Sequence, residues 1–156
     1  MRSLSMKKIL FLCTGNYYRS RFAEHLFNWL AIKQGLDWHA DSRGLALERG
    51  ANNVGPISRY TLEVLATRLV NVIDDERFPK PAEEQDFQAA ARIIALDELE
   101  HRPLMNERFP QWTEKIEYWL VHDIDKTSPL EALGQIEKNL FQLIEQLAQS
   151  ESRSAE

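Results

Sequence analysis

The feature that most constrains the fold is a short apolar run that ends in a tight turn and is followed at once by helical spacing. Residues 7–12, KKILFL, have the character of a buried strand, and the turn residues Thr14, Gly15 and Asn16 end it. Apolar residues then recur every three or four positions until Gly35, which indicates a helix with one apolar face: Phe22, Ala23, Leu26, Phe27 and Leu30. The chain therefore opens as strand, tight loop and helix.

The same alternation continues to the end of the chain. The sequence predicts strands at 38–44, 92–97 and 117–121, helices at 57–69, 82–91 and 98–107, and a loop over 43–56. A last helix is marked by Ser128 as N-cap, Pro129 in the first turn and Glu131 closing a capping box. Because parallel neighbours need crossover connections, this pattern predicts an α/β fold, a four-stranded parallel sheet with helices on both faces.

Composition bounds the class of protein. A chain of 156 residues, 44% hydrophobic and 28% charged, fits one soluble globular domain, expected over residues 1–149, with a disordered polar tail over 150–156. The formal net charge of −5 argues against nucleic-acid or anionic-membrane partners, because these require a cationic surface. Any anion site must therefore be local.

Cysteine usage and the amino-terminal segment bear on the compartment. Cys13 is the single cysteine, so no intrachain disulfide can form and we expect a cytoplasmic protein. The apolar run before it is shorter than a signal-peptide core, and no stretch approaches the roughly 20 apolar residues of a membrane span.

Three segments follow predicted parallel strands, where ligands bind in such sheets: Cys13, Asp97 and residues 122–125. The first belongs to the string C-T-G-N-Y-Y-R-S, in which five residues separate Cys13 from Arg19. A loop of this length can turn its N–H groups inward beside a helix N-terminus, which makes an anion site. Arg19 could grip two phosphate oxygens with its planar fork.

The chemistry expected of this loop is nucleophilic. A field that binds phosphate also favours the thiolate of Cys13, to which Ser20 could donate a hydrogen bond. Gly15 and Asn16 suit positive backbone φ angles. A buried, inert cysteine is the alternative interpretation of the same residue. The residues predicted to bind substrate are Thr14, Gly15, Asn16, Tyr17, Tyr18 and Ser20.

The string FLCTGNYYRSRFAEHLF resembles the opening of the low-molecular-weight protein tyrosine phosphatases, whose loop follows the pattern C-x-G-N-x-C-R-S-P. The resemblance extends to D-S-R-G, N-V-G-P, A-L-D and V-H-D further along the chain. It implies that Cys13 is the nucleophile and Arg19 the phosphate clamp. It also implies that Ser42 braces Asn16.

The resemblance further implies that Asp123 is the general acid. A phosphomonoester's leaving oxygen needs a proton, and the same carboxylate can later deprotonate the attacking water. Asp125 is the rival candidate. Asp97 either supports the active-site loops or caps the following helix.

The sequence also departs from the family pattern. Tyr18 stands in place of the second loop cysteine, Arg21 in place of a proline, and Asn52 in place of an aromatic residue. The acid loop reads D-I-D-K, so two aromatic pocket walls are missing. Tyr17 and Tyr18 either restore a wall at the rim or pack their rings against the helix.

These observations lead to three functional hypotheses. The first is a phosphatase with no metal or cofactor, acting on a phosphorylated protein or small aryl phosphate through phosphocysteine, with inorganic phosphate as a loop ligand. The second is a non-catalytic phosphoprotein-binding module, and the third is arsenate reduction, which the single cysteine disfavours. The choice between phosphotyrosine and phosphoarginine stays open. The four histidines show no metal-ligand spacing: His25, His39, His101 and His122.

Overall fold

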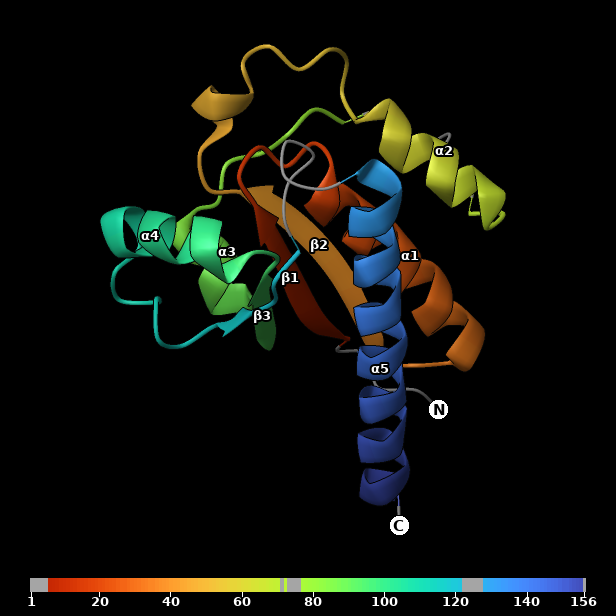
Figure 1. Ribbon diagram of the computed structural model, residues 1–156. Coiled ribbons are helices and arrows are strands. Elements are labelled where there is room, and N and C mark those ends of the chain that lie inside the picture. The colour runs from red at the N-terminus through yellow and green to blue at the C-terminus, as the bar shows by residue number, and fades with distance from the viewer. Residues whose placement is uncertain (1–5, 71, 73–76, 122–127, 156) are drawn as a thin grey trace.

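Parallel strands form one sheet in the order β2-β1-β3-β4, which places the first strand of the chain at its centre (Figure 1). The computed structural model describes residues 6–70, 72, 77–121 and 128–155. The strands are β1 (Lys7–Cys13), β2 (Trp38–Gly44), β3 (Arg92–Ala95) and β4 (Glu117–Tyr118). The predicted α/β fold with a four-stranded parallel sheet is confirmed.

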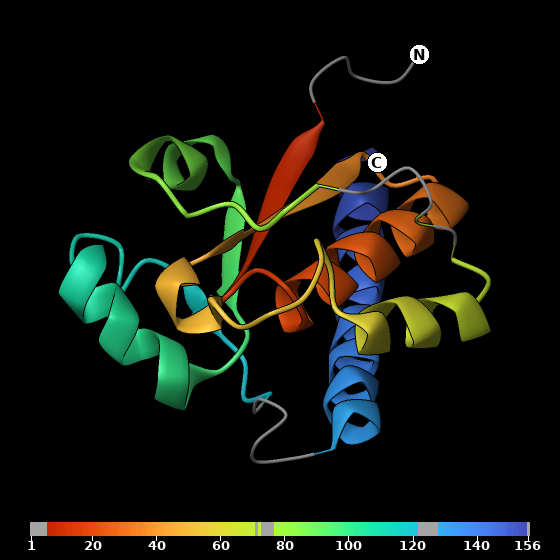
Figure 2. The same cartoon turned by 90° about the horizontal axis from the view of Figure 1, so that it is seen from above.

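Helices cover both faces of this sheet, as Figures 1 and 2 show. Side chains of β1 alternate between the faces, so that Ile9 and Phe11 pack in one core and Leu10 and Leu12 in the other. The first core includes side chains of α1 (Arg19–Gln34), α2 (Arg59–Thr67) and α5 (Pro129–Ala155). The second includes side chains of α3 (Glu84–Ala89) and α4 (Glu98–Arg108).

The strand register brings the loop after β1 against the end of β2. Cys13 pairs with Gly44, the last residues of the two strands. A Cβ on Gly44 would lie 2.6 Å from the Leu47 side chain and 2.9 Å from the Thr14 carbonyl oxygen. Only glycine therefore allows this close approach beside the predicted phosphate loop.

Several element boundaries differ from those predicted. The strand predicted at 117–121 is regular only over Glu117–Tyr118, and the chain then continues along β3 through isolated contacts such as Val121 N–H to the Leu96 carbonyl at 2.7 Å. The expected helix at 82–91 shortens to α3, and the expected loop at 43–56 contains a 3-10 turn, η1 (Leu47–Gly50).

The carboxyl-terminal helix corrects the expectation of a disordered tail. Ser128 accepts a hydrogen bond from the Glu131 N–H at 3.2 Å, as the cap prediction required. The helix then continues to Ala155 instead of ending near residue 149. The Glu151 carboxylate accepts the Asp37 N–H at 3.0 Å, which ties this end of the helix to the residue that precedes β2. Within the described residues, no helix combines the length and apolarity needed to cross a bilayer.

Candidate active site

Cys13 ends the central strand and lies at the point where the chain turns into α1. Its side chain is buried, with 2% exposed. Its Sγ atom lies 2.9 Å from the Ser20 Oγ atom in the first turn of α1. The Ser20 oxygen also accepts a hydrogen bond from the Asn16 side-chain amide at 2.9 Å. With that bond accepted, the Ser20 hydrogen is available to the sulfur.

Asn16 organises the loop from inside. It is fully buried and has a φ of 52°, as predicted, whereas Gly15 lacks the positive φ expected of it. The Asn16 amide nitrogen also donates to Ser42 Oγ at 2.9 Å, which is the contact predicted for Ser42. The side-chain oxygen of Asn16, Oδ1, accepts hydrogen bonds from the Arg77 guanidinium at 2.9 Å and from the Lys80 N–H at 3.0 Å.

A charged group behind Asn16 was not found by sequence reasoning. Ser42 donates to the Glu24 carboxylate at 2.5 Å, and Arg77 contacts the same carboxylate at 3.1 Å. Arg77 also donates to Ser42 Oγ at 3.0 Å. The loop is thus braced by residues from α1, from β2 and from the segment before α3.

Arg19 borders the pocket, but protein oxygens bind its guanidinium. One nitrogen donates to the Val121 carbonyl at 2.8 Å and the other to Glu100 Oε2 at 2.7 Å. The first nitrogen also lies 3.8 Å from Asp97 Oδ2. Asp97 at the same time caps α4 by accepting the Leu99 N–H at 3.1 Å, so both roles considered for it are present.

Glu100 and His101 form the part of the site that the sequence did not reveal. Glu100 Oε2 accepts hydrogen bonds from Arg19, from the Thr14 hydroxyl and from His101 Nε2, the last at 3.0 Å. His101 Nδ1 accepts the Asp97 N–H at 3.0 Å, so Nε2 must carry the proton. The carboxylate therefore bridges the first and last parts of the loop.

The pKa values of Glu100 and His101 are both lowered, for different reasons. Burial by itself would raise the pKa of Glu100, but the His101 hydrogen bond and the charge of Arg19 outweigh it and hold that pKa below the usual glutamate range. Burial lowers the pKa of His101. Glu100 is accordingly charged and His101 neutral near pH 7.

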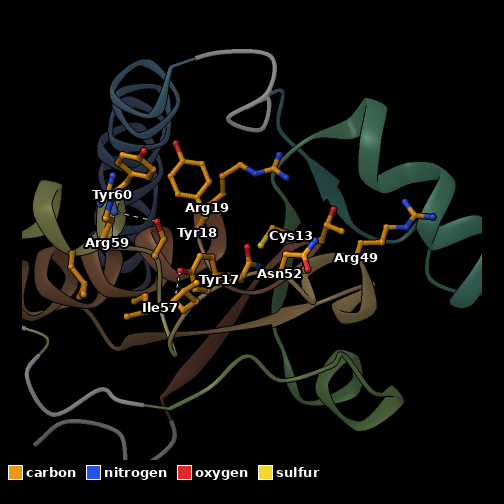
Figure 3. Close-up of a pocket in the computed structure, with 16 residues that line it drawn as sticks. Cys13, Tyr17, Tyr18, Arg19, Arg49, Asn52, Ile57, Arg59 and Tyr60 are labelled. Carbon is orange, nitrogen blue, oxygen red and sulfur yellow. Dashed lines mark hydrogen bonds between the residues drawn. The ribbon is translucent and has the colours of Figure 1, made fainter.

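The loop opens into a pocket of about 690 Å³ (Figure 3). Of the predicted substrate-binding residues, those that line it are Thr14, Gly15, Tyr17 and Tyr18, beside Cys13 and Arg19. Asn16 and Ser20 are instead fully buried and do not line the pocket. Tyr60, an aromatic residue that the sequence did not assign, lines the pocket on the same side of Cys13 as Tyr17 and Tyr18.

Comparison with known proteins decides the family. The model of the family "Low molecular weight phosphotyrosine protein phosphatase" matches residues 8–153. The chain belongs to this family. The low molecular weight protein-tyrosine-phosphatase YfkJ of Bacillus subtilis is 37% identical over 95 residues, which cover 59% of this chain and 57% of that protein. A protein-arginine-phosphatase of the same organism is 26% identical over 108 residues, 69% of this chain and 67% of that protein.

Solved structures agree with this assignment. The crystal structure of YfkJ from Bacillus subtilis aligns with a TM-score of 0.76 at 29% identity, over 94% of this chain and 97% of that one. A low molecular weight protein tyrosine phosphatase from T. tengcongensis aligns with a TM-score of 0.71 at 30% identity, over 94% and 99%. These likenesses span the sheet and its helices.

Two departures of this low-molecular-weight phosphatase from the family pattern have a structural role. Tyr18 packs in the core with 6% exposed and donates its hydroxyl to the Pro129 carbonyl at 3.2 Å, while still bordering the pocket. Arg21 is fully buried and donates to the carbonyls of Pro56 and Arg77, each at 3.0 Å. It thereby fastens two surface segments to the phosphate-loop side of α1.

The loop predicted to carry the general acid lies outside the described residues. Asp123 and its rival Asp125 fall within 122–127. Asn52 lines the pocket, as expected from its place in the sequence. In the described part of the chain, no cluster of three or more His, Cys, Asp or Glu side chains could hold a metal ion.

Proposed function

We propose that this protein is a cysteine-dependent phosphatase that hydrolyses phosphotyrosine or other aryl phosphomonoesters through a phosphocysteine intermediate. One observation carries the proposal. Cys13 lines the pocket, and its sulfur lies 2.9 Å from the Ser20 hydroxyl, which in turn accepts a hydrogen bond from Asn16. A hydroxyl that can donate to the sulfur is one way of activating such a nucleophile for covalent catalysis.

The reaction divides into two displacements. In the first, the Cys13 thiolate forms a bond to phosphorus while the bond from phosphorus to the leaving oxygen breaks, and Asp123 gives that oxygen its proton. In the second, water attacks phosphorus and gives its proton to the Asp123 carboxylate, and the S–P bond breaks to restore the thiolate. The choice of Asp123 over Asp125 rests on the family resemblance.

Arg19 is proposed to hold the transferring phosphoryl group. A guanidinium has five N–H donors in a rigid fork, so its bonds to Val121 and Glu100 fix the plane in which the fork lies. Glu100 is then a positioning residue. It aligns Arg19 and the Thr14 end of the loop relative to one another.

The lining of the pocket supports aryl substrates. Tyr17, Tyr18 and Tyr60 present aromatic surface beside the nucleophile, and an aryl ester gains free energy by packing against such rings. Phosphoarginine is a second candidate, favoured by the likeness to a Bacillus subtilis protein named as a protein-arginine-phosphatase. We also propose a cytoplasmic location, in keeping with the single free thiol.

Turnover separates catalysis from mere binding. Peptides carrying phosphotyrosine, phosphoserine or phosphoarginine are supplied with a metal chelator to the wild type and to Cys13→Ser. We expect the phosphotyrosine peptide to be hydrolysed with the highest kcat/KM by the wild type alone, and both proteins to bind inorganic phosphate. Binding without turnover in the wild type would identify the non-catalytic module, and thiol-dependent reduction of arsenate would identify the reductase.

A further inference from the structure

The mouth of the pocket is positively charged, although the protein as a whole carries a net negative charge. The chain carries 24 acidic and 19 basic residues, a net charge of −5. Among the described residues that line the pocket, three are arginines and none is acidic: Arg19, Arg49 and Arg59. Arg19 is bound to Glu100 at 2.7 Å, so the cationic character of the mouth comes from Arg49 and Arg59.

Arg49 projects from η1 and is exposed. The acidic residue before it, Glu48, is turned to Arg108, whose guanidinium it contacts at 2.6 Å. Within the described part of the chain, the guanidinium of Arg49 forms no hydrogen bond or ion pair. Its charge is therefore available to a ligand at the mouth.

Arg59 begins α2 and is also exposed. Its guanidinium lies over the Tyr60 ring, 5.3 Å from the centroid, which restricts its direction without neutralising it. The Tyr60 side chain raises the pKa of Arg59, and the charge of Glu63, one turn further along α2, acts in the same direction. Among the described residues, no ion pair within 4.0 Å joins Arg59 to Glu63.

The two arginines lie on opposite sides of the nucleophile. In Figure 3, Arg49 is on one side of Cys13 and Arg59 on the other, with the pocket between them. An extended peptide whose phosphorylated side chain enters the pocket advances roughly 3.3 Å per residue. Its flanking residues on the two sides would thus come within reach of different arginines.

From this arrangement we propose that the mouth of the pocket selects phosphorylated segments with acidic residues on both sides of the phosphorylated residue. The inference rests on the proposed function and names its protein substrates more closely. Exposed charge pairs are weak individually, so each acidic residue raises kcat/KM about two- to fivefold. The gain lies in KM, because these contacts are the same in the ground and transition states.

The test compares two phosphotyrosine peptides that differ only in Glu or Gln on both flanks. At low salt we expect the wild type to favour the Glu peptide about 4- to 25-fold in kcat/KM, and the ratio to fall towards one in high salt. Arg49→Gln and Arg59→Gln should each reduce the ratio about two- to fivefold. Lys138→Gln, an equal change of charge at an exposed site outside the pocket lining, should leave it unchanged.

Equal kcat/KM for the two peptides, or an equal loss of the ratio in Lys138→Gln, would overturn the inference. A small aryl phosphate measured on the same preparations keeps the two proposals distinct. If it is hydrolysed while the peptides are not distinguished, only the selection of acidic segments fails. If nothing is hydrolysed, the proposed function fails, and the affinities of Cys13→Ser for the two peptides still decide whether acidic flanks are selected.

Discussion

Replacing Glu100 by glutamine tests whether this carboxylate positions the phosphate clamp. Three donors converge on its Oε2 atom: the Thr14 hydroxyl, His101 Nε2 and the Arg19 guanidinium. The charged one, Arg19, donates to it at 2.7 Å. A hydrogen bond to a charged group contributes about 1.5–3 kcal/mol and a neutral one about 0.5–1.5 kcal/mol. Glu100→Gln therefore weakens the hydrogen bonds that hold Arg19 in place by about 1–2 kcal/mol. If this whole loss raises the free energy of the transition state, kcat falls roughly 5- to 30-fold.

The assay is kcat and KM for an aryl phosphate, together with the inhibition constant of inorganic phosphate. We expect kcat to fall while phosphate binds as well as before or more tightly, since a dianion no longer faces the carboxylate. Glu98→Gln is the matched control, because Glu98 pairs with Arg102 at 2.9 Å on the exposed side of the same helix. An unchanged kcat with tighter phosphate binding would refute the positioning role, and would make Glu100 a mere competitor for Arg19.

Three other predictions follow from the site. Asp123→Asn should lower kcat by about 10²–10⁴, with a smaller loss for good leaving groups, and finding that pattern in Asp125→Asn instead would show that the acid was misassigned. Asn16→Ala should lower the free energy of unfolding in urea by about 3 kcal/mol or more, because buried partners are left unpaired at a positive φ; a loss under about 1 kcal/mol would contradict the hub described for it. The depressed pKa of Glu100 should favour the folded state above pH ~4.3 and less so as pH falls, and Glu100→Gln should flatten this dependence in denaturant titrations across pH 3–6.

The sequence predicted the parts of the structure that local patterns determine. Buried runs, turn residues and helix caps placed all four strands and the loop that joins Cys13 to α1. Ser20 and Ser42 lie where the prediction needed them, one beside the sulfur and one beside the Asn16 amide.

What the sequence did not reveal depends on contacts between distant segments. Glu100 and His101 lie more than eighty positions from Thr14, and a lone Glu-His pair at the start of a helix carries no signal of its own. Their place after β3, the neighbour of the strand that ends at Cys13, was the available clue. Tyr60 was missed for the same reason, because helical spacing alone does not tell which face of α2 meets the pocket.

The tail was misjudged for a different reason. Composition gave no apolar stripe beyond residue 149, yet one long-range hydrogen bond from Asp37 to Glu151 accompanies a helix that runs to Ala155. Polar helix formers can extend a helix that is already anchored by packing, since elongation is easier than nucleation.

The central claim is that Cys13 carries the phosphoryl group during turnover. Rapid denaturation of the wild type while it hydrolyses an aryl phosphate, followed by mass spectrometry of its peptides, tests this directly, because the chain has one cysteine. The account predicts one added phosphoryl group on the peptide that contains Cys13, and neither modification nor turnover in Cys13→Ala. A phosphoryl group on another residue, or undiminished hydrolysis by Cys13→Ala, would contradict it.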